Sequence, residues 1–582
     1  MFVRSVKVPA SSGSIHEYVR VVESYREDGK IRQRVVADLG RKDVLQAMLP
    51  KLQRVLRGEP AGPEAAQGEV EIVDASTWGP VLVVRQLFDE LGLWQILDQH
   101  LGRSRGVPYP DRAFVLVANR LIAPRSEHGL AGWLETDYVC DRQGRRFLPR
   151  WHQRGRVRVH HQQLGAWYRT LDRLVAAKLE IERVLYHRLR DLFSFRPELV
   201  LYDITSTYFE GAGPPELARH GYSRDNRPDC VQVVIGVVMV AGWPIAHHVW
   251  EGNRVDATTV GEVIEDLCGR FDFGRIVFVG DRGMTSQDNL DELVKQGHGY
   301  LLGVRRRRNA ELDRWLQAVD ETKWLDCPVG ITAREKKNPP RTRVQEIPSD
   351  DPQRRVFVID SDERREFEQA MRSRAMEPTR RELERLAQRV ARGQFADEAA
   401  IGAAAERILR RRHGWRYYDW EVRRGVFHFF EHPVHLEREK RLEGKYVVIS
   451  SEQDLSPQEA VARYKELSEV ERGFRQMKDV LAMRPVWHQR PDRVQGHVFV
   501  AALGLLLSRL LERRLEEAGV DLSAAAALQA ASTLRAVRFH LDGQPPRLGA
   551  SRGAARARQV LRALGIQTLK PPAPPHGPPT IM

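Results

Sequence analysis

One carboxylate in an apolar stretch constrains this chain more than any other feature of its sequence. Residues 199–205 read Leu-Val-Leu-Tyr-Asp-Ile-Thr, a run typical of a strand that is covered on both faces of a sheet, yet Asp203 lies in its middle. An unpaired carboxylate in such a place costs several kcal/mol unless it is hydrogen-bonded or holds a metal ion. The fold must therefore supply Asp203 with partners.

The composition indicates a globular chain with several domains and a polyanionic partner. Its 582 residues include 92 Lys and Arg against 78 Asp and Glu, a net charge of +14. This excess favours association with nucleic acid, although a soluble basic enzyme without that role has the same composition. Four widely spaced cysteines offer no paired metal-ligand spacing and favour a reducing cytosol. The longest apolar run, residues 498–507, is too short to cross a membrane, so we expect no membrane partner.

Turn signals, periodicity and composition divide the chain into seven parts. Asp28-Gly29 marks a tight hairpin turn between two strand-like runs, which opens the first part. The predicted parts are a β-hairpin module (1–56), a linker (57–69), a helical DNA-binding region (70–195), the first part of a mixed-sheet α/β core (196–304), an inserted α+β domain (305–444), the second part of the core (445–515), and a helical C-terminal region with a proline-rich tail (516–582).

Three expectations about single elements follow from the same patterns. Residues 231–240 and 243–250 are predicted to form a hairpin around Ala241-Gly242. Within the inserted domain, residues 363–374 and 379–393 are predicted as two separate helices. Further on, residues 524–540 are predicted as one helix.

An arginine-rich segment lies between two of the predicted helices, over residues 142–161. Such a segment is suited to DNA phosphates because the guanidinium fork matches phosphate oxygens; a solvated charged loop is the alternative. Its basic and aromatic residues are Arg142, Arg145, Arg146, Trp151, His152, Arg150, Arg154, Arg156, Arg158, His160 and His161.

A second and a third carboxylate also occupy unusual positions. Asp281 follows an apolar strand and lies between Gly280 and Arg282, where a turn carboxylate paired with its neighbour is the simpler explanation. Glu471 lies on a helix that begins with a capping box at Ser456, on the same face as Phe474. A helical ion pair with Arg475 is the alternative there, but it does not explain why a carboxylate shares an apolar face.

Together the three carboxylates form a ligand set for hard cations. Asp203, Asp281 and Glu471 offer the oxygen ligands that Mg²⁺ or Mn²⁺ prefers. Two such ions support in-line phosphoryl transfer, with Asp203 bridging both and the other two carboxylates completing one site each. No organic cofactor is expected.

At this point several motifs together resemble the DDE transposases of bacterial insertion sequences, of the IS-four superfamily type. The resemblance implies an RNase H-like catalytic core that is interrupted by an inserted domain before the final glutamate. It is carried by Tyr202-Asp203, Thr205-Ser-Thr-Tyr-Phe-Glu-Gly211, Gly221-Tyr-Ser-Arg-Asp-Asn-Arg-Pro-Asp229, Glu251-Gly-Asn253, Asp281-Arg-Gly-Met284 and Val470-Glu-Arg-Gly-Phe-Arg-Gln-Met-Lys478.

The resemblance implies roles for named residues. Asp203, Asp281 and Glu471 become the catalytic, metal-binding triad. The superfamily's Tyr, Arg, Glu, Lys signature maps onto Tyr464 and Lys478 as DNA contacts, but its arginine position is Leu467 here.

Other arginines are then candidates for DNA contact. Arg472 and Arg475 are the candidates to replace the missing arginine of the signature. Arg224 and Arg227 contact DNA near the cleavage site or brace Asp225 and Asp229 in a polar loop, and Arg282, next to Asp281, is a further candidate.

The implied function is a transposase that binds the terminal inverted repeats of its element, cleaves DNA there and transfers the 3′-hydroxyl ends into target DNA. Its partners are double-stranded transposon ends and target DNA, with a homodimer in the DNA complex, in the bacterial cytoplasm at the nucleoid. Two alternatives stay open: an RNase H-like nuclease without strand transfer, and a catalytically inactive, transposase-derived DNA-binding protein.

Overall fold

The computed structural model describes residues 1–9, 15–56, 70–104, 106–147, 156–195, 199–281, 286–304, 310–328, 340–395, 397–541 and 544–572. The chain divides into two compact units, one of residues 1–73 with 539–547 and one of residues 74–538 with 548–582. The predicted linker 57–69 lies outside the described residues, as does the proline-rich tail beyond residue 572.

The N-terminal unit contains the predicted hairpin. Strands β2 (Ile15–Glu27) and β3 (Lys30–Arg41) pair antiparallel around Asp28 and Gly29, whose φ angles of 50° and 76° are both positive. Two positive φ values are what a two-residue turn needs to match the twist of the strands, so the Asp-Gly pair determines this turn. Strand β1 (Phe2–Pro9) pairs with the other edge of β2, and helix α1 (Lys42–Leu56) follows, so the module is larger than a hairpin.

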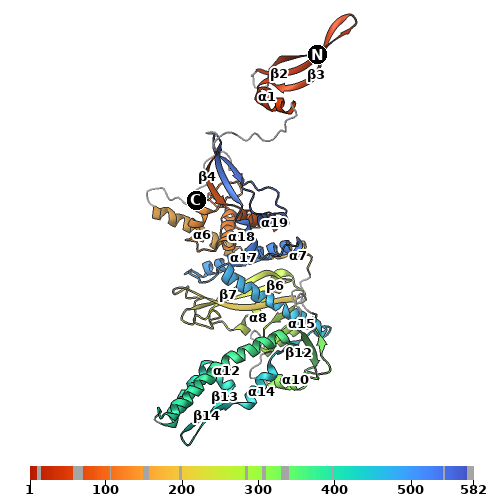
Figure 1. Ribbon diagram of the computed structural model, residues 1–582. Coiled ribbons are helices and arrows are strands. Elements are labelled where there is room, and N and C mark those ends of the chain that lie inside the picture. The colour runs from red at the N-terminus through yellow and green to blue at the C-terminus, as the bar shows by residue number, and fades with distance from the viewer. Residues whose placement is uncertain are drawn as a thin grey trace. The chain divides into compact units, whose positions relative to one another are not determined.

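A mixed sheet, with nine strands among the described residues, forms the centre of the second unit (Figure 1). Strand β5 is parallel to β8 and β8 is parallel to β9, whereas the other neighbours pair antiparallel. The spatial order is β10 (Leu325–Asp326), β11 (Thr342–Ile347), β12 (Arg355–Ser361), β15 (Lys445–Ser450), β9 (Gly299–Gly303), β8 (Val277–Gly280), β5 (Leu199–Tyr208), β6 (Gln232–Val240) and β7 (Trp243–Glu251).

The predicted β6–β7 hairpin is confirmed. Its turn residues Ala241 and Gly242 have φ angles of 51° and 81°, the same arrangement as in the N-terminal hairpin. Every residue of β6 is buried, as its largely apolar sequence predicts for a strand with both faces covered.

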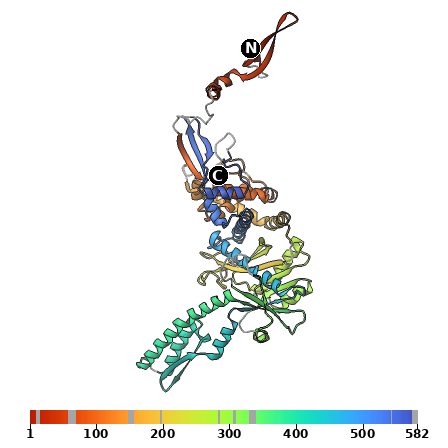
Figure 2. The same cartoon turned by 45° about the vertical axis from the view of Figure 1, so that its right-hand side comes forward.

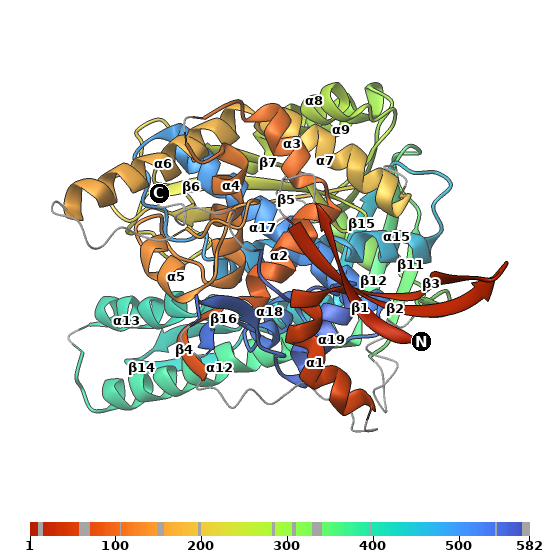
Figure 3. The same ribbon diagram turned by 90° about the horizontal axis from the view of Figure 1, so that it is seen from above.

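Helices cover the faces of this sheet (Figure 3). The central one is α17 (Pro491–Glu517), which packs against α4, α6 and β7. It is the one described helix long and apolar enough to cross a membrane, and 83% of its most apolar window is buried inside the protein, as in a core helix. The other helices that precede β9 in the chain of this unit are α2 (Gly79–Glu90), α3 (Leu93–His100), α4 (Tyr109–Ile122), α5 (Leu130–Thr136), α6 (Arg156–Ala176), α7 (Lys178–Phe193), α8 (Val260–Phe271) and α9 (Gln287–Lys295).

The predicted inserted domain shares its first strands with the core. Strands β11 and β12 were expected in a separate domain from residue 305, but β12 pairs with β15 and extends the central sheet. The described part that has its own hydrophobic core begins at α12 (Figure 2). It comprises α12 (Asp362–Ala391), α13 (Glu398–Arg411), β13 (Tyr418–Arg423), β14 (Val426–Glu431) and α14 (Pro433–Leu442), while α10 (Ala310–Gln317) precedes β10.

The prediction of two helices in this insertion is wrong, because α12 continues through Pro378. On the C-terminal side of the proline, Leu383 and Leu386 are buried in the core of the insertion. The Thr379 hydroxyl also donates to the Ala375 carbonyl oxygen at 2.7 Å. Packing of the second half of the helix therefore outweighs the local cost of the proline.

The prediction of one helix over residues 524–540 is also wrong. Helix α18 (Ala524–Ala531) ends early, and residues 535–541 form strand β16 (Arg535–Leu541). The backbone amides of Trp78 and Gly79 both donate to the Leu534 carbonyl oxygen at 3.0 Å, so a tertiary contact fixes the chain where the helix would have continued. The remaining elements are β4 (Val70–Thr77), β17 (Arg547–Ala550) and α19 (Ala555–Ala563).

Candidate active site

Two of the three predicted carboxylates lie at the same level on neighbouring parallel strands. Strand β5 pairs with β8 in a register that joins Leu201 to Val279. Continued by two residues, this register places Asp203 level with Asp281, which directly follows the end of β8 at Gly280. Parallel neighbours lie about 4.8 Å apart, so Asp203 and Asp281 lie side by side although 78 residues separate them in the sequence.

The face of β5 that carries Asp203 is the one on which Glu471 is found. The Tyr202 hydroxyl donates to the Thr259 hydroxyl at 2.9 Å, so the even-numbered residues of β5 face the side of α8. Side chains alternate along a strand, and Asp203 therefore points to the opposite face. There, β5 is in contact with helix α16 (Leu467–Arg475), which carries Glu471.

The helical segment that positions Glu471 begins as predicted. The Ser456 hydroxyl accepts a hydrogen bond from the Glu459 amide, and the Glu459 carboxylate accepts one from the Ser456 amide, which completes the capping box. Helix α15 (Pro457–Lys465) is followed at once by α16.

The apolar face of α16 is buried, but Glu471 at its margin is exposed. Leu467 and Phe474 are each 6% exposed and pack into the main core. Glu471 opens into a groove of about 730 Å³. No ion pair joins it to Arg475 within the part of the chain that the structure describes.

The groove beside Glu471 lies between the catalytic core and the insertion. The start of α12 provides one wall, including Arg364 and Phe367, and α15 and α16 provide another, including Tyr464. Phe367 is 64% exposed. A charged substrate can therefore approach Glu471 through an open space instead of a closed cavity.

Electrostatics in the cluster favour a bound cation. The pKa of Asp203 is raised to about 7, chiefly because burial disfavours the charged carboxylate. The charges of Glu471 and Asp281 raise it further, whereas the Ile204 amide, which donates to Asp203 at 2.8 Å, and the Arg224 guanidinium lower it. Three oxygen-donor groups that repel one another fit a divalent ion such as Mg²⁺ or Mn²⁺, whose charge would relieve that repulsion.

Tyr464 contributes to the wall of this groove. It packs so closely on β9 that a β-carbon at Gly303 would collide with its hydroxyl group. Burial raises the pKa of Tyr464, and the charge of Asp281 raises it further. The hydroxyl therefore stays protonated and lies within the electrostatic reach of the carboxylates.

Lys478 does not extend into solvent, contrary to what a DNA contact would need. Its ammonium group donates to Asp225 at 2.8 Å, and its side chain is 10% exposed. Asp225 also accepts from Arg484 at 2.7 Å. The sequence motif around Gly221 to Asp229 contains Asp225, but its sequence does not indicate which distant cations it pairs with.

Of the arginines near the signature, the exposed ones lie on the outer face of α16. Arg472 pairs with Glu469 at 2.6 Å and its side chain is 58% exposed, and Arg475 is also exposed. Leu467 occupies the arginine position of the signature but is buried, which explains why an apolar residue is stable there.

Both loop arginines pair with carboxylates, but of the two that the sequence suggested only Asp229 is among the partners given by the structure, and Asp225 pairs with Lys478 and Arg484. Arg224 pairs with Asp256 at 2.9 Å, and Arg227 pairs with Asp229 at 2.8 Å and with Glu210 at 3.4 Å. Arg224 also acts on the pKa of Asp203 and is therefore the nearer of the two to the cluster. Arg282 lies outside the described residues.

Two glycines of the quoted motifs are in direct contact. A β-carbon at Gly221 would collide with the Gly252 carbonyl oxygen. The Gly252 amide in turn donates to the Leu217 carbonyl oxygen at 2.9 Å. This close approach explains the glycine at position 221, and the carbonyl oxygens of Gln232 and Arg219 leave no room for a β-carbon at Gly252.

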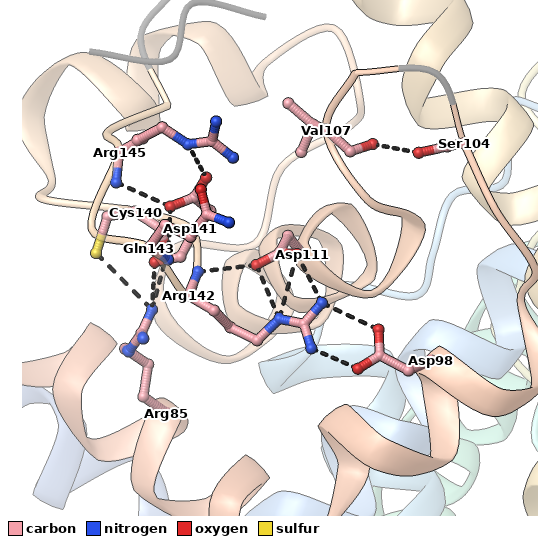
Figure 4. Close-up of polar contacts among 10 residues, drawn as sticks. All are labelled: Arg85, Asp98, Ser104, Val107, Asp111, Cys140, Asp141, Arg142, Gln143 and Arg145. Carbon is pink, nitrogen blue, oxygen red and sulfur yellow. Dashed lines mark hydrogen bonds and ion pairs between the residues drawn. The ribbon is translucent and has the colours of Figure 1, made fainter. Parts of the chain in front are cut away.

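The arginine-rich segment 142–161 is bound largely to the protein itself where it is described (Figure 4). Arg142 forms ion pairs with Asp98 and Asp111, and Arg145 pairs with Asp141. Arg146 pairs with Asp74 at 2.9 Å. These ion pairs hold the three guanidinium groups against neighbouring parts of the protein, and DNA contact by them stays a prediction.

The structure does not describe the side chains of most of the other residues in segment 142–161. Residues 148–155, which include Arg150, Trp151, His152 and Arg154, lie outside the described residues. Helix α6 begins at Arg156, and the side chains of residues 156–162 are outside the description as well.

A second cluster of possible metal ligands went unnoticed in the sequence. The side chains of Glu127, His488 and His497 are all buried, and their ligating atoms lie within 4.8 Å of one another. Arg120 donates to the Nδ1 atom of His497 at 2.9 Å, and His497 Nε2 donates to the Met483 carbonyl oxygen. Both ring nitrogens of His497 are thus in use, and the guanidinium already supplies the positive charge that a metal would bring.

Two family profiles match parts of the chain. A family profile described as the transposase DDE domain matches residues 196–507, more than half of the chain, and one described as the IS1634 family transposase N-terminal domain matches residues 3–67. A search of curated proteins gave no match.

Proposed function

Because the chain belongs to the DDE transposases of insertion sequences, we propose that it binds the terminal inverted repeats of its own element, cleaves DNA at these ends and joins the freed 3′-hydroxyl groups to target DNA. As a member of this family it is a metal-dependent enzyme of DNA transposition. The finer steps, from repeat binding to strand transfer, are our inference.

The convergence of Asp203, Asp281 and Glu471 carries the proposal. Their mutual repulsion and the raised pKa of Asp203 are expected of carboxylates that share cations. We assign Asp203, Asp281 and Glu471 as the residues that would hold Mg²⁺ or Mn²⁺. When bound, such ions would activate the attacking oxygen and stabilise the leaving oxygen of an in-line phosphoryl transfer.

The chain's own residues then position the DNA. The exposed Arg472 and Arg475 are suited to phosphates next to the groove, and Arg224 is suited to the phosphate nearest Asp203. Tyr464 shapes the groove wall beside Glu471. Phosphate contacts of this kind set the position of the DNA but do not read its sequence.

Three further assignments rest on the family. The order β7-β6-β5-β8-β9, with β5, β8 and β9 parallel, supports an RNase H-like core. Assembly of two protomers on two DNA ends is expected for concerted transfer. The net charge of +14 suits a protein that works on chromosomal DNA in the bacterial cytoplasm.

The test is an assay on duplex DNA that carries the element's end and its flanking sequence, with Mg²⁺ or Mn²⁺ and a target plasmid. We expect cleavage at the end and joined products, both abolished by Asp203→Asn and by Glu471→Gln. Cleavage without joined product would favour the nuclease alternative. Binding without cleavage by the wild-type chain would favour the inactive DNA-binding protein, and full activity of either variant would overturn the assignment of the site.

A further inference from the structure

A deeply buried carboxylate, Asp225, holds two cations from the segment that follows the helix of Glu471. Its Oδ1 atom accepts from Lys478 at 2.8 Å and from Arg484 at 2.7 Å. The Asp225 side chain is 2% exposed and that of Lys478 is 10% exposed. Arg484 also forms an ion pair with Asp479. A carboxylate buried to this degree is tolerated only while its cations stay in place, so the arrangement is fixed.

On one side, Asp225 belongs to a loop that is attached to β5. The Arg224 amide donates to the Ser206 hydroxyl at 3.0 Å, and this hydroxyl donates to the Tyr222 carbonyl oxygen at 2.9 Å. Ser206 lies on the same strand as Asp203, three residues further along. Movement of this loop relative to the strand of Asp203 would break these bonds.

On the other side, the ion pair attaches to the helix of Glu471. Lys478 lies in a π-helical turn, Gln476–Val480, which directly follows α16. It comes seven residues after Glu471, about two helical turns. The pair between Asp225 and Lys478 therefore connects the strand that carries one metal ligand to the helix that carries another.

We propose that Asp225 is a positioning residue, which sets the separation of Asp203 and Glu471 by holding Lys478, and that Lys478 acts through this pair instead of contacting a DNA phosphate. This inference rests on the proposed function of the carboxylate site. It also accounts for the pairing of the Lys478 ammonium group with Asp225 and for the 10% exposure of its side chain.

The experiment compares the full-length Asp225→Asn variant with the wild type and with Glu216→Gln, which alters an exposed carboxylate in the same connection between β5 and β6. For Asp225→Asn we expect kcat for end cleavage to fall roughly 10–100-fold and the Mn²⁺ concentration for half-maximal rate to rise, because a support of the metal ligands is lost. The Kd for the end duplex should stay within about twofold. Glu216→Gln should match the wild type in all three.

A second variant keeps the proposal falsifiable if Asp225→Asn does not fold. Lys478→Met leaves Asp225 paired with Arg484, and it should reproduce the loss in kcat without a change in DNA affinity. The double variant should have a kcat only slightly lower than that of either single variant, because both substitutions remove the same contact between Asp225 and Lys478. If Lys478→Met instead weakens DNA binding and lowers its salt dependence by about one phosphate contact, the proposal is overturned.

A readout without DNA separates this inference from the proposed function. The rise in melting temperature on adding Mn²⁺ reports ion binding to the carboxylates even if the wild-type chain cleaves no DNA. We expect Asp225→Asn to need more Mn²⁺ for the same rise. An unchanged Mn²⁺ dependence in this variant would overturn the positioning role and leave the proposed function intact.

Discussion

Two polar clusters in the same unit assemble side chains that can ligate a metal, and they differ in how their charges are balanced. Asp203, Asp281 and Glu471 converge with like charges, which helps to raise the pKa of Asp203 to about 7. In the other cluster, formed by Glu127, His488 and His497, the guanidinium of Arg120 lies 3.8 Å from Glu127 and donates to His497. In the second cluster a guanidinium thus supplies a positive charge next to the carboxylate, whereas in the first the charges of Glu471 and Asp281 both raise the pKa of Asp203.

The difference shows that proximity of ligand types does not by itself identify a metal site. In the second cluster, burial lowers the pKa of both His488 and His497, which favours neutral rings, and His497 serves as a hydrogen-bonding group. Arg120 also donates to the Ala482 carbonyl oxygen at 3.1 Å, so the cluster fixes the chain beyond Lys478. One cluster is thus suited to chemistry and the other to support, and substitutions should affect them in opposite ways.

The largest expected effect is on catalysis at the first cluster. Asp203→Asn should lower the rate of end cleavage roughly 10⁴-fold or more, as removal of a central catalytic group does in other enzymes. Without divalent ions the same change should raise the free energy of unfolding, because it removes a buried carboxylate that faces two others. Cleavage assays and urea denaturation in EDTA measure the two effects; a destabilised variant would contradict the charge imbalance that we infer.

At the second cluster, the substitution Arg120→Met should act on stability. Removing the cation leaves Glu127 buried without its charge partner, which costs about 3–5 kcal/mol in the free energy of unfolding. Arg183→Met is the matched control, because Arg183 forms an exposed pair with Glu180 on α7 and should change stability by less than about 0.5 kcal/mol. Equal losses in both variants would mean that the cluster is not charge-balanced by Arg120.

The next largest effect should be the stabilisation of the protein by divalent ions, which should depend on the first cluster. At a concentration about a hundred times the Kd, Mn²⁺ should stabilise the wild type by about 2.7 kcal/mol, measured by thermal denaturation. Glu471→Gln should lose most of this gain, whereas His488→Gln should keep it. The reverse pattern would show that the histidine cluster binds the ion.

The smallest expected effect is the pH dependence of stability, with opposite sign at the two clusters. The folded-state pKa of Asp203 is raised from an ordinary value near 3.8 to about 7, so the folded state binds more protons in that window and stability falls as the pH rises through it. The pKa of His497 is lowered below its usual 6.5, so its contribution is complete above pH 6.5 and is lost as the pH falls below it.

Denaturation curves from pH 4 to 8 measure these slopes. Asp203→Asn should remove the loss of stability on the alkaline side, and His497→Gln should reduce the loss on the acidic side. The groups that face Asp203 are Glu471, Asp281 and Arg224, so Glu471→Gln should show a weaker form of the same change. Curves that are unchanged by both substitutions would contradict the opposite signs.

Much of the fold follows from local signals. Asp28-Gly29 and Ala241-Gly242 each mark a turn that the structure contains, and Ser456 begins a helix as its capping box predicts. Two helices were predicted on either side of Pro378, but α12 is continuous because its second half packs into the core of the insertion. The β-strand after α18 was missed because the chain is fixed there by hydrogen bonds to Trp78 and Gly79, which are far away in the sequence.

For the site, the sequence by itself determined which carboxylates stand out. Asp203 interrupts an apolar strand and Glu471 shares a helix face with Phe474, and both anomalies are local. Only the tertiary structure decided what surrounds them, because pairing depends on residues hundreds of positions apart. It was the fold that joined Lys478 to Asp225, 253 positions away, and supplied Arg120 to His497, 377 positions away. The like charges around Asp203 and the pairing of His497 with Arg120 both depend on long-range contacts. A local sequence pattern therefore does not predict them.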